Sequence, residues 1–247
     1  MTRTATRRLI VPISAVAAAV ALATAAPAPA AQHESAMSSM PSDSQSHAAR
    51  SAQDRVSDAV SLVQQMKQDP GLAAVLERAR GIFIIPHYGK GGFIVGGEGG
   101  GGVVLAKNES GWSSPAFYSM GGGSIGAQAG GEGGAIAMIL MTQKAVDRFA
   151  NANRSWSLNG NAGLTVVNWS GRTQANTSKG DVILWSNTSG VYGGLTASVT
   201  HISPDTKMDQ EYYQRTVTSA QILAGNINSP SADTLRNALA SRMASSR

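Results

Sequence analysis

The pattern of apolar and polar positions predicts two amphipathic helices at the start of the folded region. From residue 51 onward, apolar residues recur every three or four positions, as on the buried face of a helix. Ser51 and Asp54 have the spacing of a capping box, which predicts that the first helix begins at Ser51. Asp69 and Pro70 have the form of an N-cap followed by proline at the first helical position, and Gly81 ends the second helix. The two apolar stripes are Val56, Ala59, Val60, Val63 and Met66, then Leu72, Val75, Leu76 and Ala79.

Beyond the second helix, the spacing of apolar residues changes to that of strands. Residues 81–86 and 135–141 are continuous apolar runs, typical of strands that are buried on both faces. Residues 156–167 and 191–199 alternate apolar and polar side chains, which predicts strands with one buried face. Residues 186–190 have the composition of a hairpin turn ahead of the last of these strands.

Three further segments have helical patterns: residues 142–151 within the strand-rich region, residues 208–225, and a weaker stretch at 231–243. Together, these patterns predict an α+β fold. Its centre is a glycine-rich, strongly curved antiparallel β core, sandwich or barrel-like, and it is flanked by N-terminal amphipathic helices and a C-terminal helix.

The first fifty residues are predicted to lie outside this fold. Residues 1–31 have the basic, apolar and small-residue segments of a signal peptide, so we expect an exported protein that is periplasmic or secreted and envelope-associated. Residues 32–50 are polar and predict a disordered linker. The folded domain is then expected over 51–225, followed by a C-terminal helical tail over 226–247.

Charge and cysteine content narrow the functional classes. The chain has a formal net charge of +5, and removing the three arginines of the signal peptide leaves +2. This weak positive charge argues against a nucleic-acid-binding protein. The sequence has no cysteine, which excludes disulfides, thiolate metal sites and a lipoprotein anchor. We expect neither a cofactor nor a bound metal.

Glycine is concentrated between residues 81 and 134, which hold 19 of the 28 glycines. Residues 97–102 fit the dinucleotide fingerprint G-x-G-x-x-G, but Val-Val-Leu follows, where nucleotide binding needs a helix. A flexible linker would lack the Val, Ile and Phe residues that alternate with these glycines. The glycines are therefore predicted to lie in strands, where they permit bends and close backbone approach.

Ser124 lies in a second misleading motif, the G-x-S-x-G of a hydrolase nucleophile elbow. His201 and Asp205 follow it in the chain and would be the base and acid of a triad, but the residues after Ser124 are glycine-spaced and extended instead of helical. We therefore expect no catalytic residue and no enzymatic activity.

Four segments occur in an order that resembles the SYLF-domain family of lipid-binding domains. They are "GIFIIPHYGKGGFIVGGEGGGGVVLAK", "WSSPAFYSMGGGSIGAQAGGE", "MILMTQKAVDRFA" and "YYQRTVTSAQILAG". The residues that match the family signature are Pro86, Phe93, Gly96, Gly97, Ser124, Gly126, Gln128, Gly130, Tyr212, Tyr213, Ile222, Leu223 and Gly225. The resemblance implies non-catalytic binding of membrane phospholipid. Eukaryotic members bind phosphoinositides through an N-terminal amphipathic helix and basic residues, and fungal members also bind actin.

Lys67, Arg78, Arg80 and Lys90 are the candidate lipid-binding residues, because they are expected to cluster around the two helices and the first turn. Each cation close to an anionic membrane contributes roughly 1 kcal/mol, so an anionic phospholipid is the expected partner. Two alternatives remain open at this point. The helices can pack on the sheet instead of on a membrane, and the protein can be a structural or adhesive envelope protein that contacts other proteins.

Overall fold

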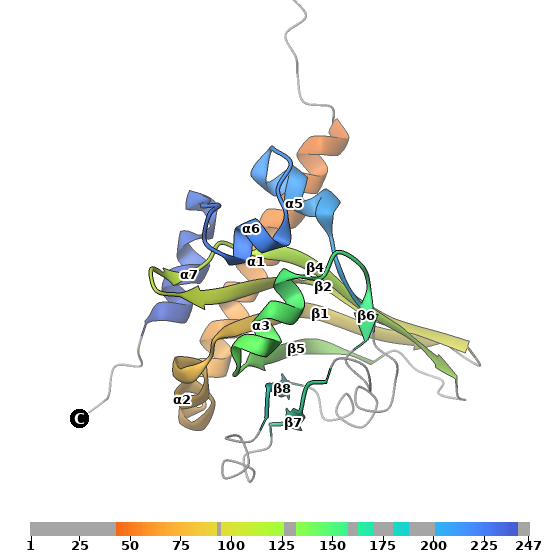
Figure 1. Ribbon diagram of the computed structural model, residues 1–247. Helices are drawn as coiled ribbons and strands as arrows, with labels where there is room; N and C mark the ends of the chain where they lie inside the picture. The colour runs from red at the N-terminus through yellow and green to blue at the C-terminus, as the bar shows by residue number, and fades with distance from the viewer. Residues whose placement is uncertain are drawn as a thin grey trace, which may run out of the picture. The chain divides into compact units, whose positions relative to one another are not determined.

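Within the described residues, nine strands form one curled, mostly antiparallel sheet (Figure 1). The computed structural model describes residues 43–92, 95–125, 132–157, 163–169, 180–187 and 201–241. The strands are β1 (Gly81–Gly92), β2 (Val95–Asn108), β3 (Gly111–Trp112), β4 (Ala116–Ile125), β5 (Glu132–Leu140), β6 (Trp156–Ser157), β7 (Val166–Asn168), β8 (Val182–Ser186) and β9 (His201–Pro204). Their order across the sheet is β6-β9-β4-β2-β1-β5-β8-β7, with β3 paired to β2. Among the described strands, only β7 and β8 pair in parallel.

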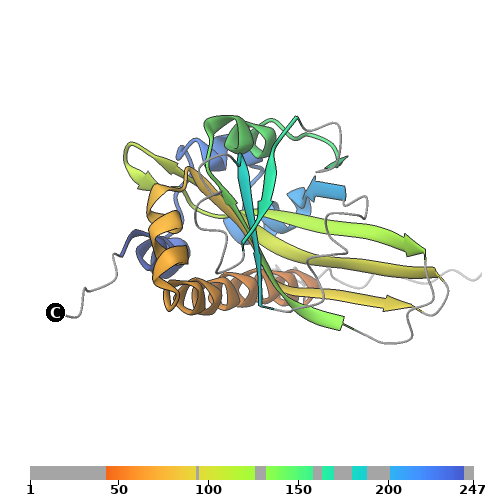
Figure 2. The same cartoon turned by 90° about the horizontal axis from the view of Figure 1, so that it is seen from below.

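Helices cover both faces of this sheet. They are α1 (Asp43–Lys67), α2 (Pro70–Arg78), α3 (Gln143–Ala150), α5 (Thr206–Tyr213), α6 (Ser219–Leu223) and α7 (Asp233–Ala240), with a short 3₁₀ turn, η2, at Pro230–Ala232. Figure 2 shows α1 along one face and α3 on the opposite face. The half-barrel with its flanking helices confirms the predicted α+β class.

The sheet separates two hydrophobic cores, which explains why its central strands are apolar on both faces. Ile82 and Ile84 of β1 lie in the core that α1, α2 and α7 cover. Phe83 and Ile85, which alternate with them, lie in the core that α3 and α6 cover. Phe149 of α3 stacks edge-on against Phe83, with 5.4 Å between ring centroids. Because helices cover both faces of the sheet, both faces of its central strands are apolar.

The apolar stripe of α1 is part of the core. Val56, Ala59, Val63 and Met66 are each at most 4% exposed, and they pack against residues of α2, α7 and the sheet. Asp69 caps α2 as predicted, since its Oδ1 accepts hydrogen bonds from the backbone N–H groups of Gly71 and Leu72. Of the two readings left open for these helices, the structure shows packing on the sheet.

Three predicted elements need correction: the start of the first helix, the strand at 156–167 and the C-terminal helix at 208–225. Helix α1 begins at Asp43, so the end of the predicted disordered linker is helical and Ser51 lies inside the helix. No proline or glycine interrupts residues 43–67, and the helix extends through them. The predicted strand at 156–167 is not continuous: β6 lies at its start and β7 at its end, and residues 163–165 lie in neither strand. Residues 158–162 fall outside the described residues. The strand at 191–199 and most of the turn at 186–190 fall outside the described residues, as do residues 1–42.

The predicted C-terminal helix over 208–225 is two helices, α5 and α6. Gln214 ends α5 in the left-handed conformation, with φ of 53°. Thr218 then begins α6 with a capping box, in which its hydroxyl accepts from the Gln221 N–H and the Gln221 side chain accepts from the Thr218 N–H. The predicted tail helix is present as α7.

The glycines of β2 allow close approach of the neighbouring chain segments, as predicted. A Cβ atom on Gly102 would lie 2.2 Å from the carbonyl oxygen of Ile84, and one on Gly101 would lie 2.4 Å from Cζ of Arg55. Arg55 of α1 thus rests directly on the strand while its Nη1 lies 4.0 Å from Oδ2 of Asp205. Residues 97–102 continue within a strand, which confirms the architectural role of these glycines.

Replacing Gly102 by alanine is expected to destabilise the domain by about 1–3 kcal/mol, because the new methyl group meets a backbone atom that cannot move away cheaply. Gly89→Ala is the matched control, since a Cβ at Gly89 would have no neighbour within 4 Å. Urea denaturation of both variants measures the difference. Equal stability of the two would contradict this account of the glycines.

Candidate functional site

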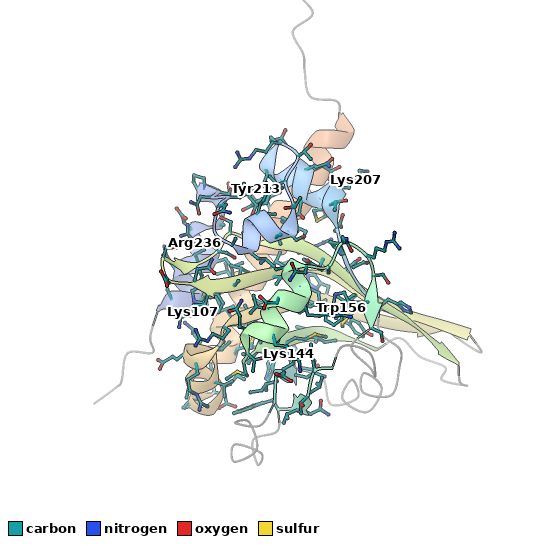
Figure 3. All side chains as sticks on the ribbon, in the orientation of Figure 1. Lys107, Lys144, Trp156, Lys207, Tyr213 and Arg236 are labelled. Atoms are coloured by element: carbon teal, nitrogen blue, oxygen red, sulfur yellow. The ribbon has the colours of Figure 1, made fainter. Side chains whose placement is uncertain are left out.

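Three cations gather at one end of the central strands, where α2 leads into β1. Arg78 lies in the last turn of α2, Arg80 directly precedes β1, and Lys107 lies near the end of β2. The backbone holds the last two side by side, because the Lys107 N–H donates to the Arg80 carbonyl at 2.8 Å. The Arg80 N–H donates in turn to the carbonyl of Leu140 on β5, also at 2.8 Å. Figure 3 labels Lys107 at this end of the sheet.

These cations line an open hollow of about 820 Å³, which we call the α2–β2 hollow. Its walls also include Asn108, Glu109 and Gln143, so three positive charges face one carboxylate. Arg78, Arg80 and Lys107 are all exposed, and Lys107 Nζ donates to the carbonyl of Glu77 at 2.9 Å. An exposed cluster of net positive charge can bind an anionic group.

The structure brings together Arg78 and Arg80 among the four predicted lipid-binding residues, and adds Lys107. Lys67 lies elsewhere: its ammonium donates to the carbonyls of Ala238, Leu239 and Ser241 at the end of α7. Partial burial lowers the pKa of Lys67, while the charge of Glu77 opposes that shift. Lys67 therefore caps the C-terminal end of α7.

Lys90 lies near the opposite end of β1 from Arg80, and the four predicted residues therefore do not form one cluster. It is ten residues from Arg80, and strand geometry makes the separation about 30 Å. The backbone register pairs Lys90 with Glu98 on β2 and with Glu132 on β5. Lys90 thus occupies a position between two acidic residues.

Those residues of the family signature that the structure describes occupy structural positions. Pro86 is buried within β1, where the pairing with β2 and β5 is irregular. Tyr213 donates from its hydroxyl to the carbonyl of Pro115 at 2.6 Å, and Tyr212 packs against Phe117 at 5.1 Å. Gly225 has φ of 82°, which favours glycine. In the register of the sheet, Gly96 pairs with Gly92 and Ser124, and Gly97 with Gly91 and Gly123. Phe93, Gly126, Gln128 and Gly130 fall outside the described residues.

One buried carboxyl group was not anticipated from the sequence. Asp209 of α5 is 0% exposed, and its Oδ1 accepts a hydrogen bond from the Phe117 N–H at 2.9 Å. Its Oδ2 has no hydrogen-bond partner within the described part of the chain. Burial raises the pKa of Asp209 to about 7, with the Phe117 hydrogen bond opposing the shift and the charge of Asp205 adding to it.

The described ranges contain neither a metal-binding cluster nor a membrane-spanning helix. Among those residues, no three His, Asp or Glu side chains are grouped closely enough to hold a metal ion. None of the helices in the same ranges combines the length and the apolar character needed to cross a bilayer.

Comparison with known proteins relates this domain to yeast proteins. The family model described as "Las17-binding protein actin regulator" (Ysc84) matches residues 121–242. "LAS seventeen-binding protein 3" of Saccharomyces cerevisiae is 32% identical over 68% of this chain, and "Protein YSC84" of the same yeast is 31% identical over 68%. "SH3 domain-containing protein PJ696.02" of Schizosaccharomyces pombe is 28% identical over 64% of the chain.

The aligned region spans only 38%, 37% and 38% of the length of these three relatives, respectively. No solved structure matches the chain. The family match covers the second half of the sheet and helices α3 to α7, including the paired tyrosines. Together with the yeast relatives, it shows that the chain belongs to the Ysc84 family, the family of the SYLF domain.

Proposed function

We propose that this domain binds anionic phospholipids at a membrane surface without catalysis, using the α2–β2 hollow. The observation that carries the proposal is the convergence of Arg78, Arg80 and Lys107 on one open surface with a single lining carboxylate. Three cations near an anionic bilayer contribute roughly 3 kcal/mol, which suits reversible peripheral attachment. Family membership supports a binding role, since the SYLF resemblance implies lipid binding.

The proposed surface differs from the N-terminal helix expected from the family resemblance. The apolar stripe of α1 is buried, so it has no free face to insert among acyl chains. Residues 51–67 carry four charges, of which Arg55 lies against Asp205 and Lys67 caps α7. The outward charges are those of Asp54 and Asp58, which an anionic membrane would repel. Attraction to such a membrane is therefore assigned to the hollow at the end of α2.

Changing Arg78 and Arg80 together to glutamine is expected to weaken binding to anionic vesicles about 30-fold at low salt, since two cations contribute roughly 2 kcal/mol. Vesicle sedimentation measures this loss, and added salt should release the unmodified protein, because the Debye length is about 8 Å at physiological ionic strength. Lys207→Gln with Arg215→Gln is the matched control, because it removes the same charge from exposed positions on and just after α5.

Two outcomes would argue against the proposal. Equal loss in both double variants would mean that net charge matters and the hollow does not. No sedimentation with any vesicle would favour the alternative, a structural or adhesive protein that contacts other proteins.

The names of the yeast relatives state that one of them binds LAS seventeen, but the aligned region covers less than two fifths of that protein.

The membrane that this chain meets depends on the predicted signal peptide. If residues 1–31 direct export, the anionic lipid is a phospholipid of the cell envelope. Mass determination of the protein purified from its own cells tests this part: a mass lacking the first 25 to 31 residues supports export, and an intact N-terminus contradicts it.

A further inference from the structure

A second cationic hollow lies at the C-terminal end of α3 and has no part in the function proposed above. It has a volume of about 440 Å³ and is lined by residues of α3 and of the segment that follows it. The lining side chains that matter here are Lys144, Asp147, Arg148, Arg154 and Trp156. We call it the α3 hollow. Figure 3 shows Lys144 and Trp156 on the α3 side of the sheet.

Two hydrogen-bond donors at this hollow have no acceptor among the residues that the structure describes. Trp156 is 7% exposed, and its indole Nε1 is buried without a partner. The Nε of Arg148 is also buried without a partner, and its guanidinium carbon lies 5.3 Å from the centre of the Trp156 ring. Both groups can only donate, so the partner that each lacks is an acceptor. An unpaired buried donor is unfavourable, and two of them at one hollow indicate a ligand.

The charges at the hollow select an anionic acceptor. Lys144 is already engaged, 3.7 Å from Asp181, and Asp147 accepts from the side-chain amide of Gln143 at 2.9 Å. Within the described residues, neither Arg148 nor Arg154 takes part in an ion pair. Two uncompensated guanidinium groups thus share the hollow with the indole donor.

The C-terminal end of α3 repels an anion less than a helix C-terminus with unpaired carbonyl oxygens would. The carbonyl of Phe149 accepts from the Tyr118 hydroxyl at 2.6 Å and from the Ala152 N–H at 3.1 Å. The carbonyl of Asp147 accepts from the Asn151 N–H at 2.9 Å. With these oxygens occupied, the negative end of the helix dipole is partly satisfied.

From these contacts we infer that the α3 hollow binds a phosphoryl group. The guanidinium fork of Arg148 matches the oxygens of a phosphate, and the indole N–H supplies a further donor at the base of the site. The long side chain of Arg148 can turn its fork from the ring face toward the bound group by rotation about its own torsions. The same chemistry is carried by inorganic phosphate, by a soluble phosphomonoester and by the phosphate of a lipid headgroup.

The indole N–H of Trp156 gives a direct test. The chain has four tryptophans, and therefore four indole N–H signals, of which Trp156→Phe identifies one. Titration of ¹⁵N-labelled protein with inorganic phosphate, at constant ionic strength maintained with chloride, should shift that signal saturably. Arg148→Gln should raise the Kd at least about tenfold, since it removes a charge-assisted pair. Arg78→Gln, the matched control in the other hollow, should leave the Kd within about twofold.

Trp156→Phe keeps an aromatic ring in the core and removes the donor, so calorimetry should also show weaker phosphate binding for this variant. It provides a second readout if Arg148→Gln fails to fold. The absence of a saturable shift in the Trp156 signal would overturn the inference. An equal Kd in Arg148→Gln would overturn it as well, because the signal would then report ionic screening.

Vesicles distinguish the two sources of the phosphoryl group. If a lipid supplies it, Arg148→Gln should reduce sedimentation with phosphatidic acid vesicles; if a soluble phosphate supplies it, sedimentation should be unchanged while the indole shift is lost. Either result supports the site. The inference is independent of the α2–β2 hollow, since the Arg78 and Arg80 double variant should lose vesicles and retain the Trp156 response.

Discussion

Replacing Val63 by glutamate is expected to unfold the domain. Val63 is 0% exposed on the face of α1 that packs against α2, α7 and the sheet, in a cluster of buried hydrophobic residues. An unpaired charge buried in a core destabilises by more than about 4 kcal/mol, a large part of the 5–15 kcal/mol that holds a typical domain together. The expected result is loss of the cooperative melting transition.

The neighbouring exposed residue gives the control for this experiment. Gln64→Glu adds the same charge on the outer face of α1 and should change stability by no more than about 0.5 kcal/mol. Circular dichroism melts of the two variants decide the matter. If Val63→Glu melted normally but no longer sedimented with vesicles, α1 would be a membrane anchor that leaves the sheet, and the account of α1 as core would be wrong.

Asp209 is expected to make the domain more stable at pH 4.5 than at pH 8. The pKa of Asp209 is about 7 in the folded protein, above the ordinary value of 3.8 that applies to the unfolded chain, so folding favours the protonated carboxyl. The stabilisation is fully present below pH 3.8 and is lost as the pH rises through about 7. A difference of about three pH units corresponds to roughly 4 kcal/mol at most.

Asp209→Asn isolates this contribution. The amide oxygen can still accept from the Phe117 N–H, and the side chain has no charge to bury. The variant should be several kcal/mol more stable than the original at pH 8, with little difference near pH 4. Urea denaturation at both pH values measures the free energy of unfolding, and Asp54→Asn, at an exposed position, is the control. A parallel pH dependence in Asp209→Asn and the unmodified protein would contradict the assignment.

Asp181 sets the lowest pH at which the stabilities of the Asp209 variants can be compared without a second titrating group. Hydrogen bonds from the Thr165 N–H and the Thr142 hydroxyl lower its pKa, and Lys144 lowers it further. Stability from Asp181 is therefore present above its ordinary pKa and lost as the pH falls through its lowered value. Comparison of the Asp209 variants above pH 4 leaves this second effect unchanged in both proteins.

The elements of the fold that could be predicted are those whose signals lie in the nearby sequence. The Asp69-Pro70 start of α2, the helix predicted at 142–151 and the two-sided burial of β1 and β5 all have causes within a few residues of chain. The start of α1 and the break at Gln214 could not be predicted in the same way. Residues 43–50 lack a strong apolar stripe, and Gln214 adopts a left-handed conformation that its residue type does not require.

The candidate site was only half predictable because it depends on register. Arg78 and Arg80 are close in sequence, but Lys107 joins them through the pairing of β1 with β2, in which Gly81 lies opposite Ala106. Pairing residues 81–92 with the segment that ends at Lys107, as an antiparallel hairpin, would have placed Lys107 close to Arg80. The same register places Lys90 near the end of β1 that is opposite to Arg80. No pattern within α1 indicates that Lys67 contacts α7. Asp209 was missed because nothing in its local sequence marks it as buried.

The contact between Lys67 and the end of α7 has a consequence for the order in which the chain can fold. Lys67 and Ala238 are 171 residues apart, and α1 packs against both α5 and α7. On a ribosome, α1 is complete long before either of these partners has been synthesised. One side of its apolar stripe must therefore remain uncovered until α5 and α7 have been synthesised, and such long-range closure makes folding slow. The core of this domain closes only after α7 has been synthesised, so a protein that binds unfolded polypeptide has time to engage α1 first.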